Sequence, residues 1–250
     1  MISCKLAGGL GNYMFQIGAM YSLSSNVGFD IQNTTQVHKN IKTYLTNIFR
    51  NVNFSVSGLQ YQYDEPEFTY NKLPNEDNIL FNGYFQSEKY LQREKVLNLY
   101  SIDGDSIKYI HSKYKDILTN SVSIHVRRGD YLNKQNKHPI QDIKYYNSAI
   151  SHMTHFNNCE NFIIFSDDIK WCKNNFIGDK FTFIEGEKDY IDLWLMSLCN
   201  HNIIANSSFS WWGAWLNQNP NKKVIAPINW FGPEKKLNPK DIYCKNWIKI

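Results

Sequence analysis

The chain has 250 residues and a mass of 29.4 kDa, which is enough for one large domain or two small ones and excludes a mini-protein. Hydrophobic residues make up 42% and charged residues 20% of the sequence, a composition that excludes a disordered or low-complexity chain. The net charge of +4 is spread along the chain without a run of about five like charges, which fits a basic pocket better than a nucleic-acid-binding surface.

Cysteine usage and the N-terminal segment both bear on location. Five cysteines, none of them in a C-x-x-C pair, predict reduced thiols rather than a disulfide framework or a zinc ribbon. Residues 1–24 are fairly apolar, but glycines, Asn12 and Gln16 interrupt them and no basic segment precedes them. We therefore expect neither a signal peptide nor a membrane anchor, and a cytoplasmic protein.

The first element is a short apolar segment at residues 2–7, which ends at Gly8 and Gly9 and predicts a buried strand. From Asn12 to Leu23, apolar residues recur every three or four positions, which predicts a helix whose first turn Asn12 caps. A strand, a glycine turn and a helix in this order open a doubly wound α/β sheet.

Residues 26–118 show little pattern beyond a short apolar segment at 79–85 and an expected helix at 106–118. From residue 121, predicted strands and helices alternate strictly, which indicates a parallel sheet covered on both faces. We expect strands at 121–126, 162–168, 181–184, 202–207 and 223–227, and helices at 142–156, 169–176, 190–201 and 208–217. Ligands of such sheets bind at the carboxyl ends of the strands.

Polar clusters follow three of these strands. In the first, Arg127 and Arg128 can face an anion, because guanidinium groups match phosphate oxygens in a bidentate way. A diphosphate is the obvious ligand, and a surface ion-pair cluster with Asp130 is the alternative. In the second, Asp167 and Asp168 could bind a divalent cation, accept from the edge of a purine, or cap the next helix.

The third cluster, at residues 206–210, places small hydroxyl residues between a strand and a helix. Free backbone N–H groups and the helix dipole make such a turn an anion site. The alternative is ordinary N-capping by Ser208 with an aromatic stripe beyond it. Trp211 and Trp215 share one helix face, so we expect them to brace the turn against the core rather than to stack on a sugar.

A dinucleotide-binding fingerprint does not fit the glycine turn. With Gly9 and Gly11 as its first two glycines, Met14 occupies the third position and would hold strand and helix apart. What remains is that the backbone of this turn can approach a ligand closely.

Four segments together resemble the ordered motifs of glycosyltransferase family 11, the α-1,2-fucosyltransferases, within the wider inverting fucosyltransferase group. They are GGLGNYMFQ at 8–16, HVRRGDY at 125–131, SDD at 166–168 and ANSSFSWWGAWL at 205–216. The family usually has Gln where this chain has Tyr13, which puts a polar contact at that position in doubt.

The resemblance implies a GT-B fold, with two Rossmann-like domains of parallel sheets facing across a cleft. We expect an acceptor-side domain at 1–118 and a GDP-fucose-binding domain at 119–250, whose last segment can pack back on the first. The implied partners are GDP-fucose and a galactose-terminated glycan acceptor, with no metal or other cofactor and no nucleic acid.

The resemblance also implies roles for single residues. His125 and Arg127 would contact the nucleotide and its β-phosphate, Arg128 would support that site, and Asp167 or Asp168 would accept from the guanine. The remaining implied donor contacts come from two turns: Gly9, Gly11 and Asn12 in the first, and Ser207, Ser208 and the Phe209 amide in the second.

The implied reaction moves L-fucose from GDP-β-L-fucose to the 2-hydroxyl of a terminal galactose with inversion, which forms an α-1,2 linkage. Arg127 is the expected stabiliser of the leaving diphosphate. Asp130 is the nearest carboxylate that could take the acceptor proton, and an equal alternative is that it orients Arg127 or Arg128.

Three other functions stay open. Asp103 and Asp105 have the D-x-D spacing of metal-dependent glycosyltransferases, although turn and cap chemistry also explains them. The aromatic content of 15% also allows a carbohydrate- or guanine-nucleotide-binding protein without turnover. A nicotinamide oxidoreductase is disfavoured by Met14.

Overall fold

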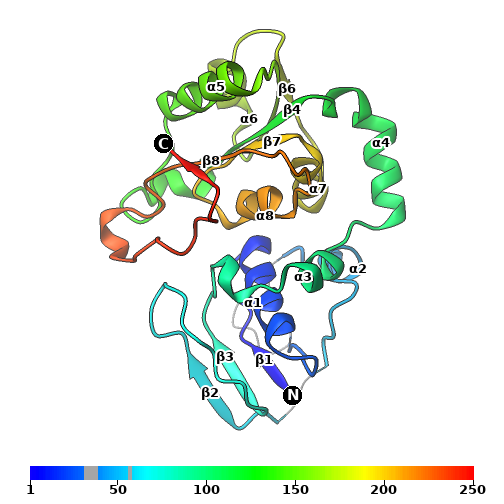
Figure 1. Cartoon of the computed structure of the whole chain (residues 1–250), viewed down its shortest axis with the longest axis vertical. Helices are drawn as coiled ribbons and strands as arrows, with labels where there is room; N and C mark the ends of the chain where they lie inside the picture. The colour runs from blue at the N-terminus through cyan, green and yellow to red at the C-terminus, as the bar shows by residue number, and fades with distance from the viewer. Residues whose placement is uncertain (31–38, 56–57) are drawn as a thin grey trace. The chain divides into compact units, whose positions relative to one another are not determined.

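The computed structural model describes residues 1–30, 39–55 and 58–250, which form two compact units (Figure 1). The first unit comprises Met1–Asp103 and Leu237–Cys244, and the second comprises Gly104–Lys236 and Lys245–Ile250. The division after residue 103 differs from the expected one after 118, because helix α4 (Gly104–Leu118) packs against α7 (Asp189–Leu198) of the second unit.

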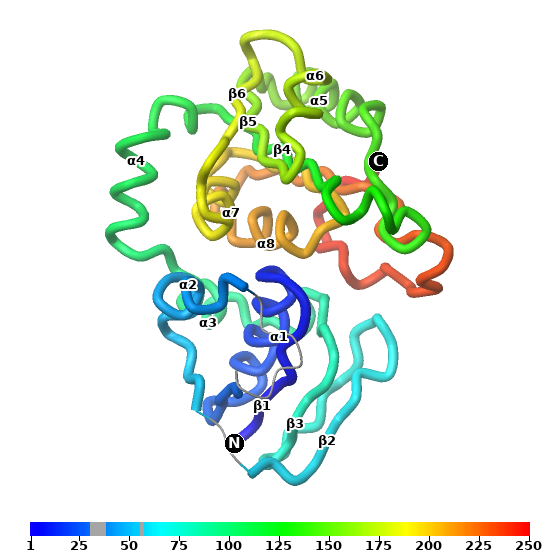
Figure 2. Tube along the Cα trace, turned by 180° about the vertical axis from the view of Figure 1, so that it is seen from behind, coloured from blue at the N-terminus to red at the C-terminus, as the bar shows by residue number. Residues whose placement is uncertain are grey.

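The first unit has a three-stranded parallel sheet in the order β1-β3-β2, which Figure 2 shows beside helix α1. Its elements are β1 (Ile2–Cys4), α1 (Leu10–Leu23), α2 (Ile41–Thr46), β2 (Tyr61–Asp64), β3 (Ile79–Asn82) and α3 (Arg93–Leu99). β1 and α1 match the predicted strand and helix, whereas β2, α2 and α3 were not predicted. The segment 237–244 joins this unit, where the Asp241 carboxylate pairs with Lys89 at 2.5 Å.

The second unit has a six-stranded sheet in the order β6-β5-β4-β7-β8-β9, and every neighbouring pair is parallel. Its strands are β4 (Ser121–Val126), β5 (Asn161–Ser166), β6 (Phe181–Phe183), β7 (His201–Ile203), β8 (Val224–Ala226) and β9 (Ile248–Lys249). Its other helices are α5 (Ile143–Asn157), α6 (Ile169–Asn175) and α8 (Ser208–Leu216). The predicted α/β class with parallel sheets is confirmed.

The differences from the predicted elements lie mostly at their ends. The predicted helix at 190–201 ends at Leu198, and His201 is instead the first residue of β7. The predicted strand at 162–168 ends at Ser166, since the Asp168 carboxylate accepts from the Trp171 N–H and caps α6. β9 was not predicted, because its two residues are too short for a periodic pattern.

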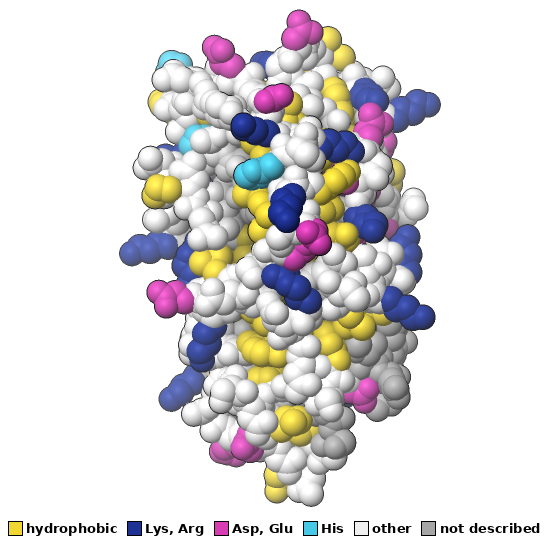
Figure 3. Space-filling view, turned by 90° about the vertical axis from the view of Figure 1, so that its right-hand side faces the viewer, with side chains coloured by type: hydrophobic (Ala, Val, Ile, Leu, Met, Phe, Trp, Pro, Cys, Tyr) yellow, Lys and Arg dark blue, Asp and Glu magenta, His cyan; other side chains and the backbone are white. Residues whose placement is uncertain are grey.

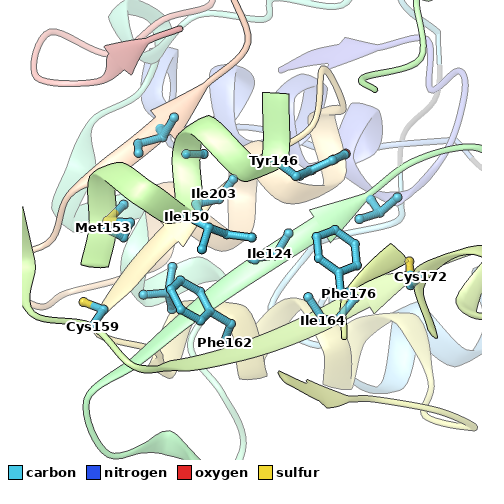
Figure 4. Packing of buried hydrophobic residues seen from close by; sticks show 14 residues of the cluster. Ile124, Tyr146, Ile150, Met153, Cys159, Phe162, Ile164, Cys172, Phe176 and Ile203 are labelled. Atoms are coloured by element: carbon cyan, nitrogen blue, oxygen red, sulfur yellow. The ribbon is translucent and has the colours of Figure 1, made fainter. Parts of the chain in front are cut away.

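One apolar cluster of the second unit lies between the sheet and helices α5 and α6 (Figure 4), and α7 and α8 bury further apolar side chains. Tyr146, Ile150 and Met153 of α5 pack against residues of β4, β5 and β7, including Ile124 and Ile203. This apolar layer fixes the strands, and with them the turns that follow their carboxyl ends. On the surface drawn in Figure 3, Lys and Arg side chains lie scattered among acidic, polar and apolar ones.

Candidate functional site

The three predicted polar clusters follow β4, β5 and β7, which are neighbours in the second sheet. Val126 pairs with Ser166, and Ile124 pairs with Ile203, so the strands end at nearly the same level. The clusters at 125–130, 166–168 and 206–210 therefore lie together at the carboxyl edge of the second sheet, as the geometry of parallel strands predicts.

Arg127 is held by two carboxylates. Its guanidinium lies 2.6 Å from Asp130 and 2.8 Å from Asp167, and it also lies over the ring of Tyr131 at 5.4 Å. About a third of the side chain, 35%, stays exposed. Each terminal nitrogen of the guanidinium therefore pairs with a different carboxylate, which fixes a partly exposed cation at the strand edge.

Arg128 is more enclosed than Arg127. Its Nε donates to Asp168 at 3.0 Å, and its guanidinium carbon lies 4.4 Å from the centre of the Trp171 ring. The hydrogen bond from Arg128 lowers the pKa of Asp168, which therefore stays ionised at neutral pH. The Arg128 side chain is thus held between a carboxylate and an indole, and only 16% of it is exposed.

Asp167 connects the two arginines. It pairs with the Arg127 side chain and also accepts from the backbone N–H of Arg128 at 2.9 Å. Gly129 allows this approach, because a Cβ there would lie 2.4 Å from Asp167 Oδ2. The family resemblance implied that Asp167 or Asp168 accepts from the guanine; in the structure both carboxylates pair with the arginines.

His125 is buried at the end of β4, and its ring lies 5.4 Å from that of Phe209. Its Nδ1 has no hydrogen-bond partner among the residues that the structure describes. Burial, with a smaller effect of Arg127, lowers the pKa of His125 to about 3. His125 is therefore a neutral imidazole at neutral pH, with one unpartnered nitrogen. It lies directly before residues 127–130, which we call the arginine turn.

The turn before α8 is capped by Ser207 rather than by Ser208. The Ser207 hydroxyl accepts from the Phe209 N–H at 3.3 Å, and Ser208 is the first residue of the helix. The expected capping role of Ser208 is therefore wrong by one position. Because the bond is long, the Phe209 amide is only weakly engaged by its own turn.

The aromatic stripe beyond this turn is core. Trp211 and Trp215 are buried and stack with ring centres 6.0 Å apart, and Trp247 lies 5.5 Å from Trp211. The predicted bracing role of Trp211 and Trp215 is confirmed.

Asn206 joins three loops at this edge, a role that the sequence did not reveal. Its side-chain amide donates to the carbonyls of Pro139 and Trp230 at 3.0 Å each and accepts from Gln141 at 3.1 Å. Its own carbonyl accepts from the Tyr131 hydroxyl at 3.1 Å. These partners are far apart in the sequence, so no local pattern could have found them.

The glycine turn of the first unit lies at the carboxyl end of β1. Helix α1 begins at Leu10 with Gly9 as its cap residue, so Asn12 lies inside the first turn and the expected cap at Asn12 is wrong. The Asn12 side chain instead accepts from Gln86 at 2.8 Å. Gly8 has a φ of +90° and leaves space that Asn12 occupies. Gly11 is buried.

Gln16 ties this turn to the loop after β3. It accepts from the Ala7 N–H at 3.0 Å and donates to the Gly83 carbonyl at 2.9 Å, and it is only 1% exposed. Tyr13, which departs from the family pattern, is buried as well, so it contributes to the core. The sequence predicts no role for Gln16 or Gln86, because their partners lie far from them along the chain.

The D-x-D residues flank the start of α4. The Asp105 side chain is fully exposed, and its carboxylate lies 4.0 Å from Lys108 of the same helix. Within residues 1–30, 39–55 and 58–250, no three His, Cys, Asp or Glu side chains gather into a possible metal site. In the same ranges no helix has the length and apolarity to cross a membrane.

Comparison with known proteins agrees with this geometry. Solved structures with a similar fold include the fucosyltransferase NodZ from Bradyrhizobium, with a TM-score of 0.53 and 11% identity over 85% of this chain and 90% of that one. A structure of POFUT1 in complex with GDP gives a TM-score of 0.51 at 11% identity over 90% of this chain and 97% of that one. The fold of this chain is therefore that of the GT-B-type fucosyltransferases.

The sequence places the chain within that class. The family profile of glycosyl transferase family 11 matches residues 1–250, and the chain belongs to this family. It is 34% identical to an α-1,2-colitosyltransferase of Escherichia coli over 100% of this chain and 99% of the relative. It is 27% identical to galactoside α-(1,2)-fucosyltransferase 2 of Gorilla gorilla gorilla over 100% of this chain and 79% of that protein.

Proposed function

We propose that the protein transfers L-fucose from GDP-β-L-fucose to the 2-hydroxyl of a terminal galactose, with inversion and without a metal. The observation that carries this proposal is the pair of arginines at the carboxyl edge, where Arg127 is fixed by Asp130 and Asp167 but remains partly exposed. Departure of GDP places negative charge on the β-phosphate, and a preoriented guanidinium stabilises that charge.

The neighbouring groups are proposed to complete the donor site. His125, in β4, is proposed to contact the nucleotide. The turn with Ser207, Ser208 and the Phe209 amide is proposed to face the diphosphate with the positive end of α8. Both oxygens of Asp168 already accept hydrogen bonds, Oδ2 from Arg128 and Oδ1 from the Trp171 N–H, so a guanine would share one of these oxygens. Gly9, Gly11 and Asn12 are proposed to contact the sugar and phosphates.

Asp130 is assigned to orient Arg127 rather than to remove the acceptor proton. Its two oxygens lie 2.6 Å from Arg127 and 3.2 Å from Lys134. Burial raises the pKa of Asp130, but Arg127 and Lys134 outweigh burial and leave it below the usual value. A carboxylate stabilised in this way is a weak base.

A second donor is supported by one specific observation, the 34% identity to a colitosyltransferase. Colitose is 3-deoxy-L-fucose, so the two sugars differ by one hydroxyl. A site that hydrogen-bonds this hydroxyl would discriminate strongly against colitose, and an apolar contact there would discriminate weakly.

The test offers GDP-fucose, GDP-colitose and GDP-mannose separately with lactose in the presence of EDTA, and records GDP release and product linkage. We expect an α-1,2-fucosylated product, unchanged by EDTA. Arg127→Lys should lower kcat by about 10²–10³-fold, whereas Arg93→Ala at an exposed site should not. Wild-type activity in a folded Arg127→Ala protein, or loss of activity in EDTA, would refute the mechanism.

A further inference from the structure

The loop at residues 83–86 follows β3 at the carboxyl edge of the first sheet, and two side chains bind its backbone, Glu65 just after β2 and Gln16 of α1. The Glu65 carboxylate accepts from the Tyr84 N–H at 2.7 Å and from the Phe85 N–H at 3.1 Å. Gln16 donates to the Gly83 carbonyl at 2.9 Å. This loop is therefore fixed on both its N–H and its C=O side.

These hydrogen bonds hold an uncommon backbone conformation. Phe85 has a φ of +51°, in the left-handed region that side-chain-bearing residues seldom adopt. Its ring is fully buried and packs edge-on against Phe81 and Tyr90, at 6.1 and 5.6 Å between centres. Strained positions of this kind persist where the surroundings determine them and are enriched at ligand-binding sites.

The conformation of Phe85 has a consequence for its neighbour. Phe85 turns inward and Tyr84 is left 40% exposed, with no ring contact to another aromatic side chain in the part of the chain that the structure describes. An exposed aromatic ring on a rigid backbone offers an apolar face at little cost in conformational entropy. Such a face suits the C–H side of a pyranose ring.

The loop also adjoins the glycine turn. Gln86, two residues after Tyr84, donates to the Asn12 side chain at 2.8 Å. Tyr84 is thus rigidly linked to the turn that is proposed to contact the donor sugar. An acceptor sugar must lie next to the donor sugar for transfer to occur.

We propose that Tyr84 forms an acceptor subsite, in which its ring packs against a pyranose of the glycan that receives the transferred sugar. This inference rests on the proposed glycosyl transfer, and Glu65, Gln16 and Gln86 act as the residues that position the subsite. It assigns the acceptor contact to the first unit, in the part of the sequence where no motif was readable.

The experiment measures transfer to lactose and, separately, hydrolysis of GDP-fucose without acceptor. Tyr84→Ala should raise the KM for lactose roughly five- to tenfold and leave donor hydrolysis unchanged, whereas Tyr84→Phe should stay near wild type because the ring is kept. Tyr61→Ala is the matched control. Tyr61 is 65% exposed, but it begins β2 and so lies at the amino ends of the strands of the same sheet, whereas Tyr84 follows the carboxyl end of β3.

A wild-type KM in Tyr84→Ala, or equal damage in Tyr84→Phe, would overturn the subsite. If the enzyme does not use GDP-fucose at all, the proposed function fails first, and binding of lactose by ligand-observed NMR then tests Tyr84 separately. Loss of the lactose signal in Tyr84→Ala and Tyr84→Gln, but not in Tyr61→Ala, would support the subsite, and an unchanged signal in both variants would refute it.

Discussion

The Asp167 carboxylate lies 2.8 Å from the guanidinium of Arg127 and binds the backbone N–H of Arg128 as well. Asp167 therefore fixes both the side chain and the backbone of the arginine turn. We expect Asp167→Ala to lower kcat by roughly ten- to a hundredfold, because a cation displaced by about 1 Å loses much of its effect on the transition state.

Asp167→Asn should recover part of this loss, since its side-chain oxygen can still accept from the Arg128 N–H. Steady-state kinetics with varied acceptor should show kcat reduced and the acceptor KM unchanged. Equal activity of Asp167→Ala and wild type would show that Arg127 does not depend on this carboxylate.

The role of Asp130 can be determined by comparing donor hydrolysis with sugar transfer in the Asp130→Asn variant. If it orients Arg127, Asp130→Asn should slow both donor hydrolysis and transfer by a similar factor, roughly tenfold or more. If it accepts the proton of the acceptor hydroxyl, transfer alone should fall. The structure favours the first outcome, and a selective loss of transfer with normal hydrolysis would reverse the assignment.

His125 should make stability fall in mild acid. Its folded pKa of about 3 lies below the unfolded value near 6.5, so the unfolded state binds more protons between these values. The free energy of unfolding therefore decreases as the pH falls below about 6.5, by roughly 2 kcal/mol from this group between pH 7.5 and 5.

Urea unfolding of the whole protein at pH 7.5 and pH 5, followed with a probe in the second unit, tests the contribution of His125 to the free energy of unfolding. His125→Gln should lose less stability than wild type on acidification, while His111→Gln, at an exposed site of α4, should behave like wild type. An identical pH dependence of His125→Gln and wild type would contradict the buried neutral imidazole.

Gln16 should matter for stability more than its polar character suggests. Gln16→Leu leaves the Ala7 N–H and the Gly83 carbonyl without their partner, which should cost roughly 2–4 kcal/mol. Hydrogen exchange at Ala7 should accelerate in this variant, and exchange of the second unit should not change. Gln218→Leu at an exposed position is the control, and unchanged protection of Ala7 would exclude the bridging role of Gln16.

The second half of the fold was predictable because each strand and helix there carries a clear apolar period and ends at a polar turn. The grouping of residues near Arg127, Asp167 and Ser207 followed from one rule, that parallel strands place their carboxyl ends at one edge. The partners within that group were not predictable. Whether Asp168 faces a ligand or Arg128 depends on distances that no spacing in the sequence encodes.

Residues 26–118 were not readable for a different reason. β2 has only four residues and is mostly exposed, so its alternation of Tyr with polar residues marks no buried face. The contacts at the carboxyl edge of the first sheet join residues that are distant in the sequence, as Gln86 joins Asn12 and Glu65 joins Tyr84. Such long-range contacts produce no periodic pattern in the sequence, so they cannot be predicted from it.

The parallel order of the second sheet also separates two kinds of loop. All three candidate ligand turns of this sheet leave the carboxyl ends of β4, β5 and β7, whereas residues 158–160 and 217–223 enter β5 and β8 at the amino ends. The amino-end loops are therefore places where a fluorophore or an affinity tag can be attached for surface immobilisation. A linkage made there leaves the opposite edge open for binding measurements on the intact protein.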